Sequence, residues 1–380
     1  MNHSRGWRWW VGATGLAVVL AGPAGAAGER LCDAAGSKVL IGAAASAQDL
    51  ADPKFAALFV THFNAITARR DMMPSELVDD AGHYDFTKAD AVADFAAKNH
   101  LAFYGHMLLW QHLSRDWLFK DPAGRPLPRD RALANLKGYI DTVVGRYRGR
   151  VKAWDVVNEA ISDADGEYLR DVPALRAIGE DFIVKAFEFA HAADPDAELY
   201  YNDYNIELPA KRAKTLRLLR DLRAAGVRID AVGIQGHWHL PEKTLAPRVI
   251  SDAIREFSAA GFKVMITELD VDVLPRTVSG ANMETVEEGP NPYPDGLPAD
   301  VQQALAARYG AIFDAILEPG VVEMITFWGT HDGHSWLNNF PVKRRTNHPL
   351  LFDRALQPKP AFQAVVDALQ RAKGAAAENR

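Results

Sequence analysis

The residues of this sequence that could do chemistry stand at the ends of short apolar runs. Residues 153–160 read AWDVVNEA, and this run ends on Asn158 and Glu159. Residues 265–270 read MITELD and place Glu268 at the equivalent point of another run. An amide and a carboxylate are costly to keep away from water. We therefore expect both run ends to open into a cleft.

Two carboxyl groups in one cleft have a specific use. Cleavage of a glycosidic bond requires a pair of them flanking the bond, one as an acid and the other as a nucleophile or base. A loop ion pair would explain either glutamate alone. Together, Glu159 and Glu268 fit the paired requirement if the fold brings them face to face.

The surrounding elements are predicted to bring the two glutamates face to face. Eight strand-like runs, at 39–44, 63–67, 102–109, 151–157, 198–202, 231–235, 264–267 and 324–328, alternate with segments of helical periodicity. Such alternation predicts an α/β fold with a parallel sheet covered on both faces. At this length the favoured solution is a single-domain (β/α)8 TIM barrel. An open doubly wound sheet is the alternative, but no glycine-rich loop follows the first run.

The other run ends also carry polar groups, in GHMLLWQH, YYNDYN, IQGHWH and TFWGTHDGHSW. In TIM barrels the reactive groups lie at the C-terminal ends of the strands. The fourth and seventh strands face each other across the ring, so Glu159 and Glu268 are predicted to share one cleft.

The motifs WDVVNEA, YYNDYN, IQGHWHL, ITELDV, FWGTHDGHSW and LLFDRALQPKPAF, in this order, resemble the family 10 glycoside hydrolases, the endo-1,4-β-xylanases. The resemblance runs from about Leu40 to Val366. It implies a retaining enzyme that hydrolyses the β-1,4-xylan backbone, with Glu159 as acid/base and Glu268 as nucleophile. The two carboxyl groups would lie about 5–5.5 Å apart. No metal or organic cofactor is implied.

The resemblance also assigns supporting and substrate-binding roles. Asn158 would bind the 2-hydroxyl of the sugar being cleaved, while His237 and Asp270 would hold the nucleophile ionised. The residues expected to contact the substrate are His106, Trp110, Gln111, Tyr204, Gln235, Trp328 and Trp336.

One stretch departs from the family. After the second strand the family usually carries Glu-Asn and then Lys, which grip the second sugar on the glycone side, whereas this sequence has Arg69, Arg70 and Met73. Gln111 stands where a histidine usually follows the tryptophan. One hypothesis is that Arg69 or Arg70 binds a uronic-acid decoration, because guanidinium pairs bidentately with carboxylate. The alternative is that both arginines turn outward or pair with nearby acidic residues.

Three other functions stay open. A retaining β-glycosidase acting on another β-glycan shares the same carboxylates. A non-catalytic sugar-binding barrel would be expected to lose one of them. A metal-dependent barrel hydrolase could use the His237-x-His239 pair, with His106, His112, His331 or His334 added, but a bridging Asp or Lys is not evident.

The N-terminus predicts export. Arg5 and Arg8 precede an apolar run from Val11 and small residues up to Ala26, the pattern of a signal peptide cleaved near Ala26. We expect a secreted or periplasmic protein with its catalytic domain at 27–372 and a disordered tail at 373–380. Cys32 is the only cysteine, so no internal disulfide can form.

Composition limits the partners. A net charge of −6 and the lack of a Lys/Arg cluster argue against nucleic acid, and no membrane contact is expected after signal cleavage. We expect a monomer that binds a polysaccharide, xylan or a related β-glycan. Residues 275–300, rich in Pro, Gly and acidic side chains, predict a long loop, either a lid or a surface excursion.

Overall fold

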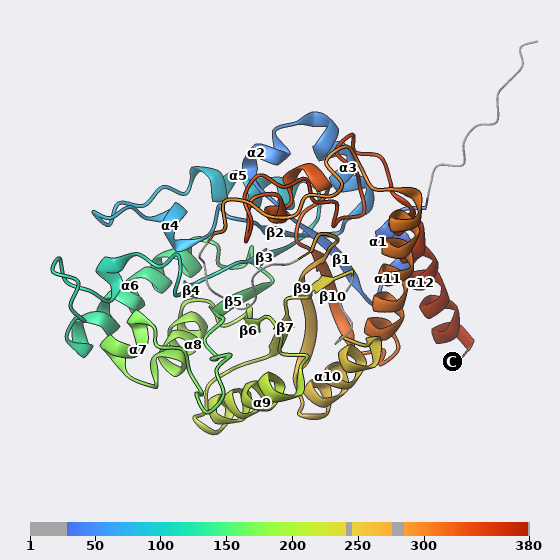
Figure 1. Ribbon diagram of the computed structural model, residues 1–380. Coiled ribbons are helices and arrows are strands. Elements are labelled where there is room, and N and C mark those ends of the chain that lie inside the picture. The colour runs from blue at the N-terminus through green and yellow to red at the C-terminus, as the bar shows by residue number, and fades with distance from the viewer. Residues whose placement is uncertain (1–28, 241–244, 276–284, 379–380) are drawn as a thin grey trace, which may run out of the picture.

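The computed structural model describes residues 29–240, 245–275 and 285–378 (Figure 1). Eight strands pair in parallel in the order β10-β1-β2-β3-β5-β6-β7-β9, and the pairing of β9 with β10 closes the barrel. They are β1 (Leu40–Ala45), β2 (Ala65–Ala68), β3 (Ala102–Gly105), β5 (Ala153–Asn158), β6 (Glu198–Asp203), β7 (Ala231–Ile234), β9 (Lys263–Asp272) and β10 (Val322–Phe327). The predicted TIM barrel is confirmed.

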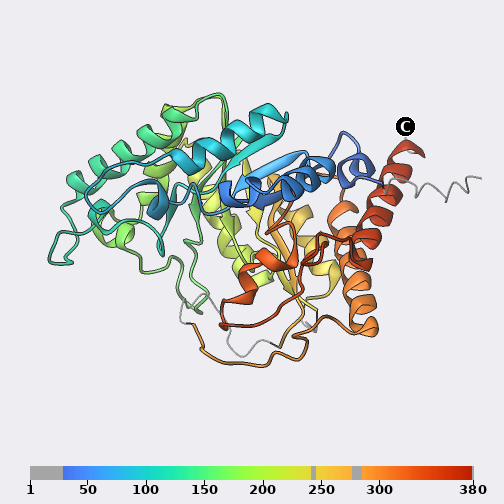
Figure 2. The same cartoon turned by 90° about the horizontal axis from the view of Figure 1, so that it is seen from above.

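Helices surround this barrel (Figures 1 and 2). They are α1 (Leu31–Ala35), α2 (Ala47–Leu50), α3 (Pro53–His62), α4 (Pro74–Leu77), α5 (Thr87–Lys98), α6 (Arg129–Arg146), α7 (Pro173–Ile178), α8 (Phe182–Ala193), α9 (Pro209–Ala224), α10 (Pro247–Ala259), α11 (Ala299–Leu317) and α12 (Pro360–Glu378). Short 3-10 turns lie at Asp116–Leu118, Asp332–His334 and Trp336–Asn338. None of the described helices is long and apolar enough to cross a bilayer.

Two apolar regions hold the barrel together. Inside it, one buried layer takes a residue from each of seven strands: Ala65, Tyr104, Ala153, Tyr200, Ala231, Met265 and Met324. Because large and small side chains fill this level, the barrel is solid below the cleft. Outside it, strand residues such as Trp154 pack against the inner faces of the helices. In α10 these inner residues are Ile250, Ala253, Ile254 and Phe257, at helical spacing.

Two predicted strands differ from those observed. The third, predicted at 102–109, is split into β3 and the two-residue β4 (Leu109–Trp110), because the chain turns at His106, which hydrogen-bonds to Asp155 of β5. The seventh, predicted at 264–267, continues to Asp272, because its extension pairs with the short strand β8 (His237–His239). These two predicted boundaries therefore fail at the C-terminal ends of their strands, where the residues of the candidate site lie.

The ends of the chain and the long loop are only partly described. The predicted signal peptide lies outside the described residues, whereas α12 continues to Glu378, into the segment predicted as a tail. Of the predicted loop, residues 285–298 lie against the segment after β10. Val286 bridges Val342, and Glu287 pairs with Lys343 at 2.7 Å.

Candidate active site

Both glutamates lie next to irregularities in strand pairing that orient their side chains. Along β5 and β6, Asp155 pairs with Tyr200 but Val157 pairs with Tyr201, so β5 carries one extra residue just before Glu159. The β9–β10 register shifts around Glu268 in the same way. Bulges of this kind re-aim side chains near active sites. Glu159 itself has a φ of 59°, which is rare for a residue with a Cβ.

Glu159 is 8% exposed and receives hydrogen bonds at both carboxyl oxygens. The indole Nε1 of Trp110 donates to Oε2 at 3.0 Å, and Nε2 of Gln235 donates to Oε1 at 2.9 Å. Burial, together with the negative charges of Asp203 and Glu268, raises the pKa of Glu159 to about 7 despite these donors. This carboxyl group can therefore hold a proton near neutral pH.

Glu268 is 4% exposed but has charged partners. His237 lies with Nε2 3.2 Å from its Oε2, and Asn202 donates to its Oε1 at 2.8 Å. Burial alone would raise the pKa of Glu268. The hydrogen bond and charge of His237, the charge of His106 and the Asn202 bond outweigh it, and the pKa falls below its ordinary value. Glu268 is therefore ionised under conditions in which Glu159 is protonated.

The two glutamates belong to one hydrogen-bonded cluster. The Oδ1 of Asn158 accepts from both Asn202 and Gln235, each at 3.1 Å. Asn202 in turn donates to Glu268, and Gln235 donates to Glu159. Three amides thus connect the carboxyl groups, which fixes their relative positions. Their predicted separation of about 5–5.5 Å stays a prediction.

His237 is held from its other side. Its Nδ1 lies 3.0 Å from Oδ1 of Asp270, whose Oδ2 accepts from the indole Nε1 of Trp336 at 2.7 Å. Burial opposes the charge on His237, but Asp270 and Glu268 overcome it and raise its pKa to about 10. The imidazolium therefore carries a positive charge beside Glu268.

Aromatic rings stand beside the cluster. Trp328 meets the rings of His106 and His237 edge to face, at centroid distances of 4.9 and 6.4 Å. Trp336 lies 4.8 Å from His237 and stacks on Phe340. Flat apolar faces with polar groups at their edges suit a sugar ring. The structure thus places Trp328 and Trp336 beside His237 and Trp110 against Glu159.

Tyr204 lies at a charged edge of the site. Its hydroxyl bonds Asp163 and Arg170, and Nζ of Lys211 lies 3.7 Å from its ring centroid. Lys211 also pairs with Asp203 at 2.7 Å. Tyr204 is thus fixed in place, and its predicted contact with substrate stays a prediction.

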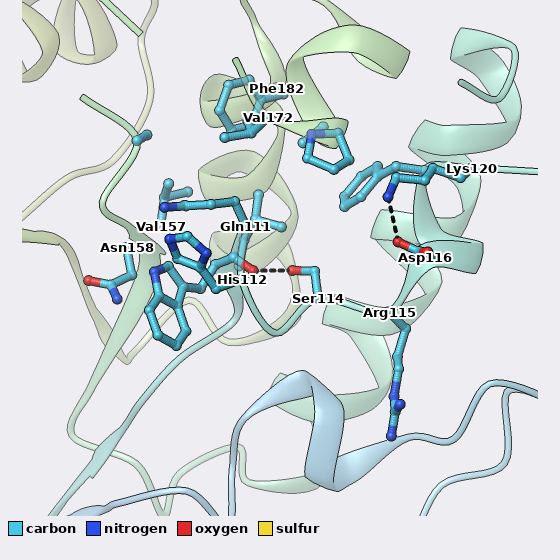
Figure 3. Close-up of a pocket in the computed structure, with 16 residues that line it drawn as sticks. Gln111, His112, Ser114, Arg115, Asp116, Lys120, Val157, Asn158, Val172 and Phe182 are labelled. Atoms are coloured by element: carbon cyan, nitrogen blue, oxygen red, sulfur yellow. Dashed lines mark hydrogen bonds and ion pairs between the residues drawn. The ribbon is translucent and has the colours of Figure 1, made fainter. Parts of the chain in front are cut away.

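The two arginines of the atypical stretch after β2 have different surroundings. Arg70 has a side chain 62% exposed and pairs with Glu76 at 3.7 Å, as the outward alternative expected. Arg69 is half-buried, and its guanidinium has no hydrogen bond or ion pair with another described residue. Gln111 lines a cavity together with Trp110 and Asn158 (Figure 3), and its predicted contact with substrate stays a prediction.

Sequence reasoning missed four residues of this site. Asn202 holds the nucleophile, Asp155 holds His106, and the buried pair Asp203–Lys211 places a charge near Glu159. Asn202 and Asp203 end the run YYND, so the strand-end rule that selected Glu159 would have found them. Asp155 and Lys211 had no such signal, because one lies inside a strand and the other on a helix.

A metal centre does not form in the described part of the chain, where no three His, Cys, Asp or Glu side chains gather to hold an ion. His237 pairs instead with Asp270 and Glu268. A closed TIM barrel that holds two buried glutamates in one hydrogen-bonded cluster, with the pKa of one raised and that of the other lowered, defines the class of barrel enzymes that cleave glycosidic bonds.

Comparison with known proteins identifies the family. The sequence model of glycosyl hydrolase family 10 matches residues 30–368 of this chain. The chain is 38% identical to endo-1,4-β-xylanase A of Xylanibacter ruminicola, over 88% of this chain and 92% of that protein. It is 39% identical to β-1,4-xylanase of Dictyoglomus thermophilum, over 81% and 83%. This chain belongs to glycosyl hydrolase family 10.

Solved structures of other proteins are also similar to this chain. A family 10 endoxylanase retrieved from a sugarcane soil metagenome superposes with a TM-score of 0.84 at 37% identity, covering 89% of this chain and 99% of that one. A second structure, a mutant in complex with xylotriose, gives a TM-score of 0.80 at 33% identity over 89% and 99%.

Proposed function

We propose that this protein is an exported endo-1,4-β-xylanase that hydrolyses the xylan backbone with retention of anomeric configuration. The observation that carries the proposal is that one amide cluster joins two buried glutamates whose surroundings raise the pKa of Glu159 and lower that of Glu268. The relatives named above as xylanases support the choice of xylan.

In the first step Glu268 attacks the anomeric carbon while the bond to the leaving oxygen breaks. The proton of Glu159 passes to that oxygen, and a glycosyl ester forms on Glu268. His237 keeps Glu268 charged before attack, and Nδ2 of the Asn158 amide lies 3.5 Å from Oε1 of Glu159.

In the second step water replaces the ester. Forming the ester removes the charge of Glu268, one of the charges that raise the pKa of Glu159, so Glu159 can remain ionised. It takes a proton from water, whose oxygen attacks the anomeric carbon and releases Glu268.

The stereochemistry of the first product tests this proposal. Xylohexaose is hydrolysed inside a proton NMR spectrometer, and we expect the β-anomer to appear first and mutarotate later. Glu268→Ala should abolish the reaction, and EDTA should leave the wild-type rate unchanged. An α-anomer appearing first, or loss of activity in EDTA, would reject the retaining two-carboxylate mechanism. Higher rates on mixed-linkage glucan than on xylan would select the other-glycan alternative.

One observation favours a finer substrate preference, for xylan decorated with uronic acid. Arg69 follows the C-terminal end of β2, on the face of the barrel where the carboxyl cluster lies. The carboxylates whose charges act on Arg69 are those of Asp49 and Asp71, and both have other partners. Asp49 lies 2.8 Å from His334, and Asp71 accepts a hydrogen bond from the backbone N–H of Ala47 at 2.6 Å. A half-buried guanidinium without its own carboxylate favours an acidic ligand.

Matched variants test this preference. Arg69→Gln and Arg70→Gln are compared on glucuronoxylan and on unbranched xylan. A hydrogen bond to a charged group contributes about 1.5–3 kcal/mol, so we expect Arg69→Gln to lose roughly tenfold or more in kcat/KM on glucuronoxylan alone. Arg70→Gln, which loses only an exposed ion pair, should match the wild type. Equal wild-type rates on both xylans would eliminate the acidic ligand.

Export is proposed from residues 1–26 alone. Expression in a Gram-negative host followed by N-terminal sequencing of the active protein tests it. We expect the mature chain to begin close to Ala27, and an intact N-terminus on a cytoplasmic enzyme would reject it.

A further inference from the structure

The short strand β8 carries the imidazole that keeps the nucleophile ionised, and it is paired along one side. Among the described strands β8 pairs with β9 alone, with His237 opposite Asp270 and Trp238 opposite Val271. Successive side chains of a strand point to opposite faces. His237 points to Asp270 and Glu268, so Trp238 points away from the carboxyl cluster.

Trp238 makes a buried hydrogen bond to a carboxyl group that has no part in the mechanism above. Trp238 and Glu207 are 3% and 2% exposed, and the indole Nε1 donates to Oε1 of Glu207 at 3.0 Å. Glu207 lies between β6 and α9, and the guanidinium of Arg212 in α9 donates to its backbone carbonyl at 3.3 Å. The indole thus ties β8 to the segment that leads into α9.

The carboxyl group of Glu207 has no cation bound to it in the described part of the chain. The ammonium group of Lys211 pairs instead with Asp203 at 2.7 Å, and Oε2 of Glu207 has no hydrogen-bond partner among the described residues. Burial raises the pKa of Glu207 by more than its backbone N–H, the Trp238 indole and the charge of Lys211 lower it, and the charge of Asp203 adds to the rise. A buried carboxyl group without a cation keeps its proton.

We propose that Glu207 is a positioning residue for the nucleophile: as an uncharged acceptor for the Trp238 indole, it fixes β8 and thereby holds His237 against Glu268. This inference rests on the proposed function, which gives His237 its role beside Glu268. Without Glu207 the indole N–H would be buried and unpaired, which is costly, and a shift of β8 would relieve that cost. The contact of His237 with Glu268 is a hydrogen bond of 3.2 Å, so such a shift weakens it.

The first test follows the acid limb of the pH profile on xylohexaose. Glu207→Ala removes the acceptor of the indole, and we expect kcat to fall about tenfold with KM unchanged. The acid limb should move to higher pH by about one unit or less, because His237 is one of the groups that lower the pKa of Glu268. Glu207→Gln offers the indole an uncharged oxygen at the same place and should restore the wild-type profile.

Further variants separate this hydrogen bond from a general loss of packing. Trp238→Phe keeps an aromatic ring but removes the N–H, so it should move the acid limb as Glu207→Ala does. If both act through one bond, the double variant should move it no further than either single variant. Trp117→Phe is the matched control, because it removes an indole bond of 3.2 Å to the carbonyl of Asp79 in the segments after β4 and β2, and its profile should equal that of the wild type. Thermal melting shows which variants fold, and Trp238→Phe decides the test if Glu207→Ala does not.

Histidine NMR measures the same contact without turnover. The His237 ring, assigned by its absence from His237→Asn, has a pKa of about 10 because of Asp270 and Glu268. We expect Glu207→Ala and Trp238→Phe to lower this pKa and Glu207→Gln to leave it unchanged.

Three results would each overturn the positioning role. They are an unchanged acid limb and His237 titration in folded Glu207→Ala, a Glu207→Gln profile equal to that of Glu207→Ala, and additive shifts in the double variant. Failure of the wild type to hydrolyse xylohexaose would overturn the proposed function instead, and the His237 titration would still decide whether Glu207 positions β8.

Discussion

The two glutamates differ in their partners rather than in their burial. Both side chains are less than a tenth exposed. Glu159 receives neutral donors and lies near two carboxylates, while Glu268 contacts an imidazolium. Desolvation disfavours charge on both, and only Glu268 has a cation to offset it. The acid and nucleophile roles therefore follow from neighbours that lie on other strands.

This difference predicts the pH dependence of the reaction. Glu159 must be protonated, so kcat/KM should fall as pH rises through its pKa, with a midpoint near pH 7. Glu268 must be ionised, and because its pKa is lowered, the acid limb should lie below the ordinary glutamate range. Initial rates on xylohexaose from pH 3 to pH 9 measure both limbs.

Glu159→Ala serves as the control for the alkaline limb. Removing a general acid costs about 10²–10⁴-fold, and we expect that loss on xylan together with disappearance of the limb. An aryl xylobioside with a good leaving group needs little protonation, so its first step should be largely spared. An alkaline limb that persists in Glu159→Ala would assign it to another residue.

Sequence could predict those residues of the site that end strands. Glu159, Glu268 and Gln235 follow apolar runs, and the barrel brings such ends together. It could not separate Arg69 from Arg70, because their exposure depends on how the chain leaves β2. The sequence also predicts Gln111 as a substrate contact; this residue lines a cavity together with Trp110 and Asn158, and its role stays a prediction.

At the scale of the element, the end of β6 acts on both carboxyl groups. Asn202 donates to Glu268, and the next residue, Asp203, is one of the charges that raise the pKa of Glu159. Asp203 is fully buried, and its carboxylate accepts from Lys211 at 2.7 Å, the Tyr201 hydroxyl at 2.6 Å and the backbone N–H of Tyr204 at 2.9 Å. One strand end thus positions the nucleophile and adjusts the acid.

Asp203→Asn should therefore shift the alkaline limb to lower pH. Removing a negative charge favours ionisation of Glu159, and we expect a shift of about one pH unit or less. Lys211 keeps a carboxylate partner, because Asp163 lies 2.9 Å from its Nζ. Asp163→Asn is the matched control, since it removes the other partner of Lys211. A shift to higher pH in Asp203→Asn would contradict the assignment.

Glycine at one position of β7 leaves room for Asn202. A Cβ on Gly233 would stand 2.4 Å from Oδ1 of Asn202 and 2.8 Å from Cγ2 of Thr267, too close for either to remain. Gly233→Ala should therefore displace Asn202 from Glu268. We expect a loss of about 1–3 kcal/mol in the free energy of unfolding and roughly tenfold or more in kcat.

Gly138→Ala in α6 provides the comparison, because its Cβ would meet no atom within 4 Å. Replacing a glycine inside a helix should stabilise by about 0.5–1 kcal/mol. Urea unfolding and steady-state kinetics of both variants measure these effects. If Gly233→Ala kept full activity, the positioning role of Asn202 would be refuted.

At the scale of the whole molecule, the site depends on closure of the ring. Its side chains come from strands between β3 and β10, and the β9–β10 pairing joins the last of them. Cys32 is the only cysteine, so no disulfide reinforces this closure. Packing of the outer helices must therefore hold the ring. Near the chain ends α1 and α12 lie side by side, with α11 against α12 (Figures 1 and 2).

Truncation from the C-terminus tests the packing of α12 without removing any residue of the active site. Among the α12 side chains whose burial is described, up to residue 375, the buried ones all precede residue 370, and the large ones are Phe362, Val365, Val366 and Leu369. At about 1.5–3 kcal/mol each they contribute roughly 6–12 kcal/mol, comparable to the whole stability of a domain. Removing 360–380 should therefore unfold the barrel and abolish activity, although every catalytic residue is retained.

Removing only 373–380 should leave the enzyme intact. This cut loses the hydrogen bond from Lys373 to the carbonyl of Asp33, which is exposed, and keeps the ion pair of Arg371 with Asp314. We expect the Tm to change by no more than about 2–4 °C and the rate on xylan to be unchanged. Circular dichroism melting and xylan assays on both truncations measure this. A folded, active 1–359 chain would show that the strands close the ring without α12, and packing of the outer layer would then not be what holds the site together.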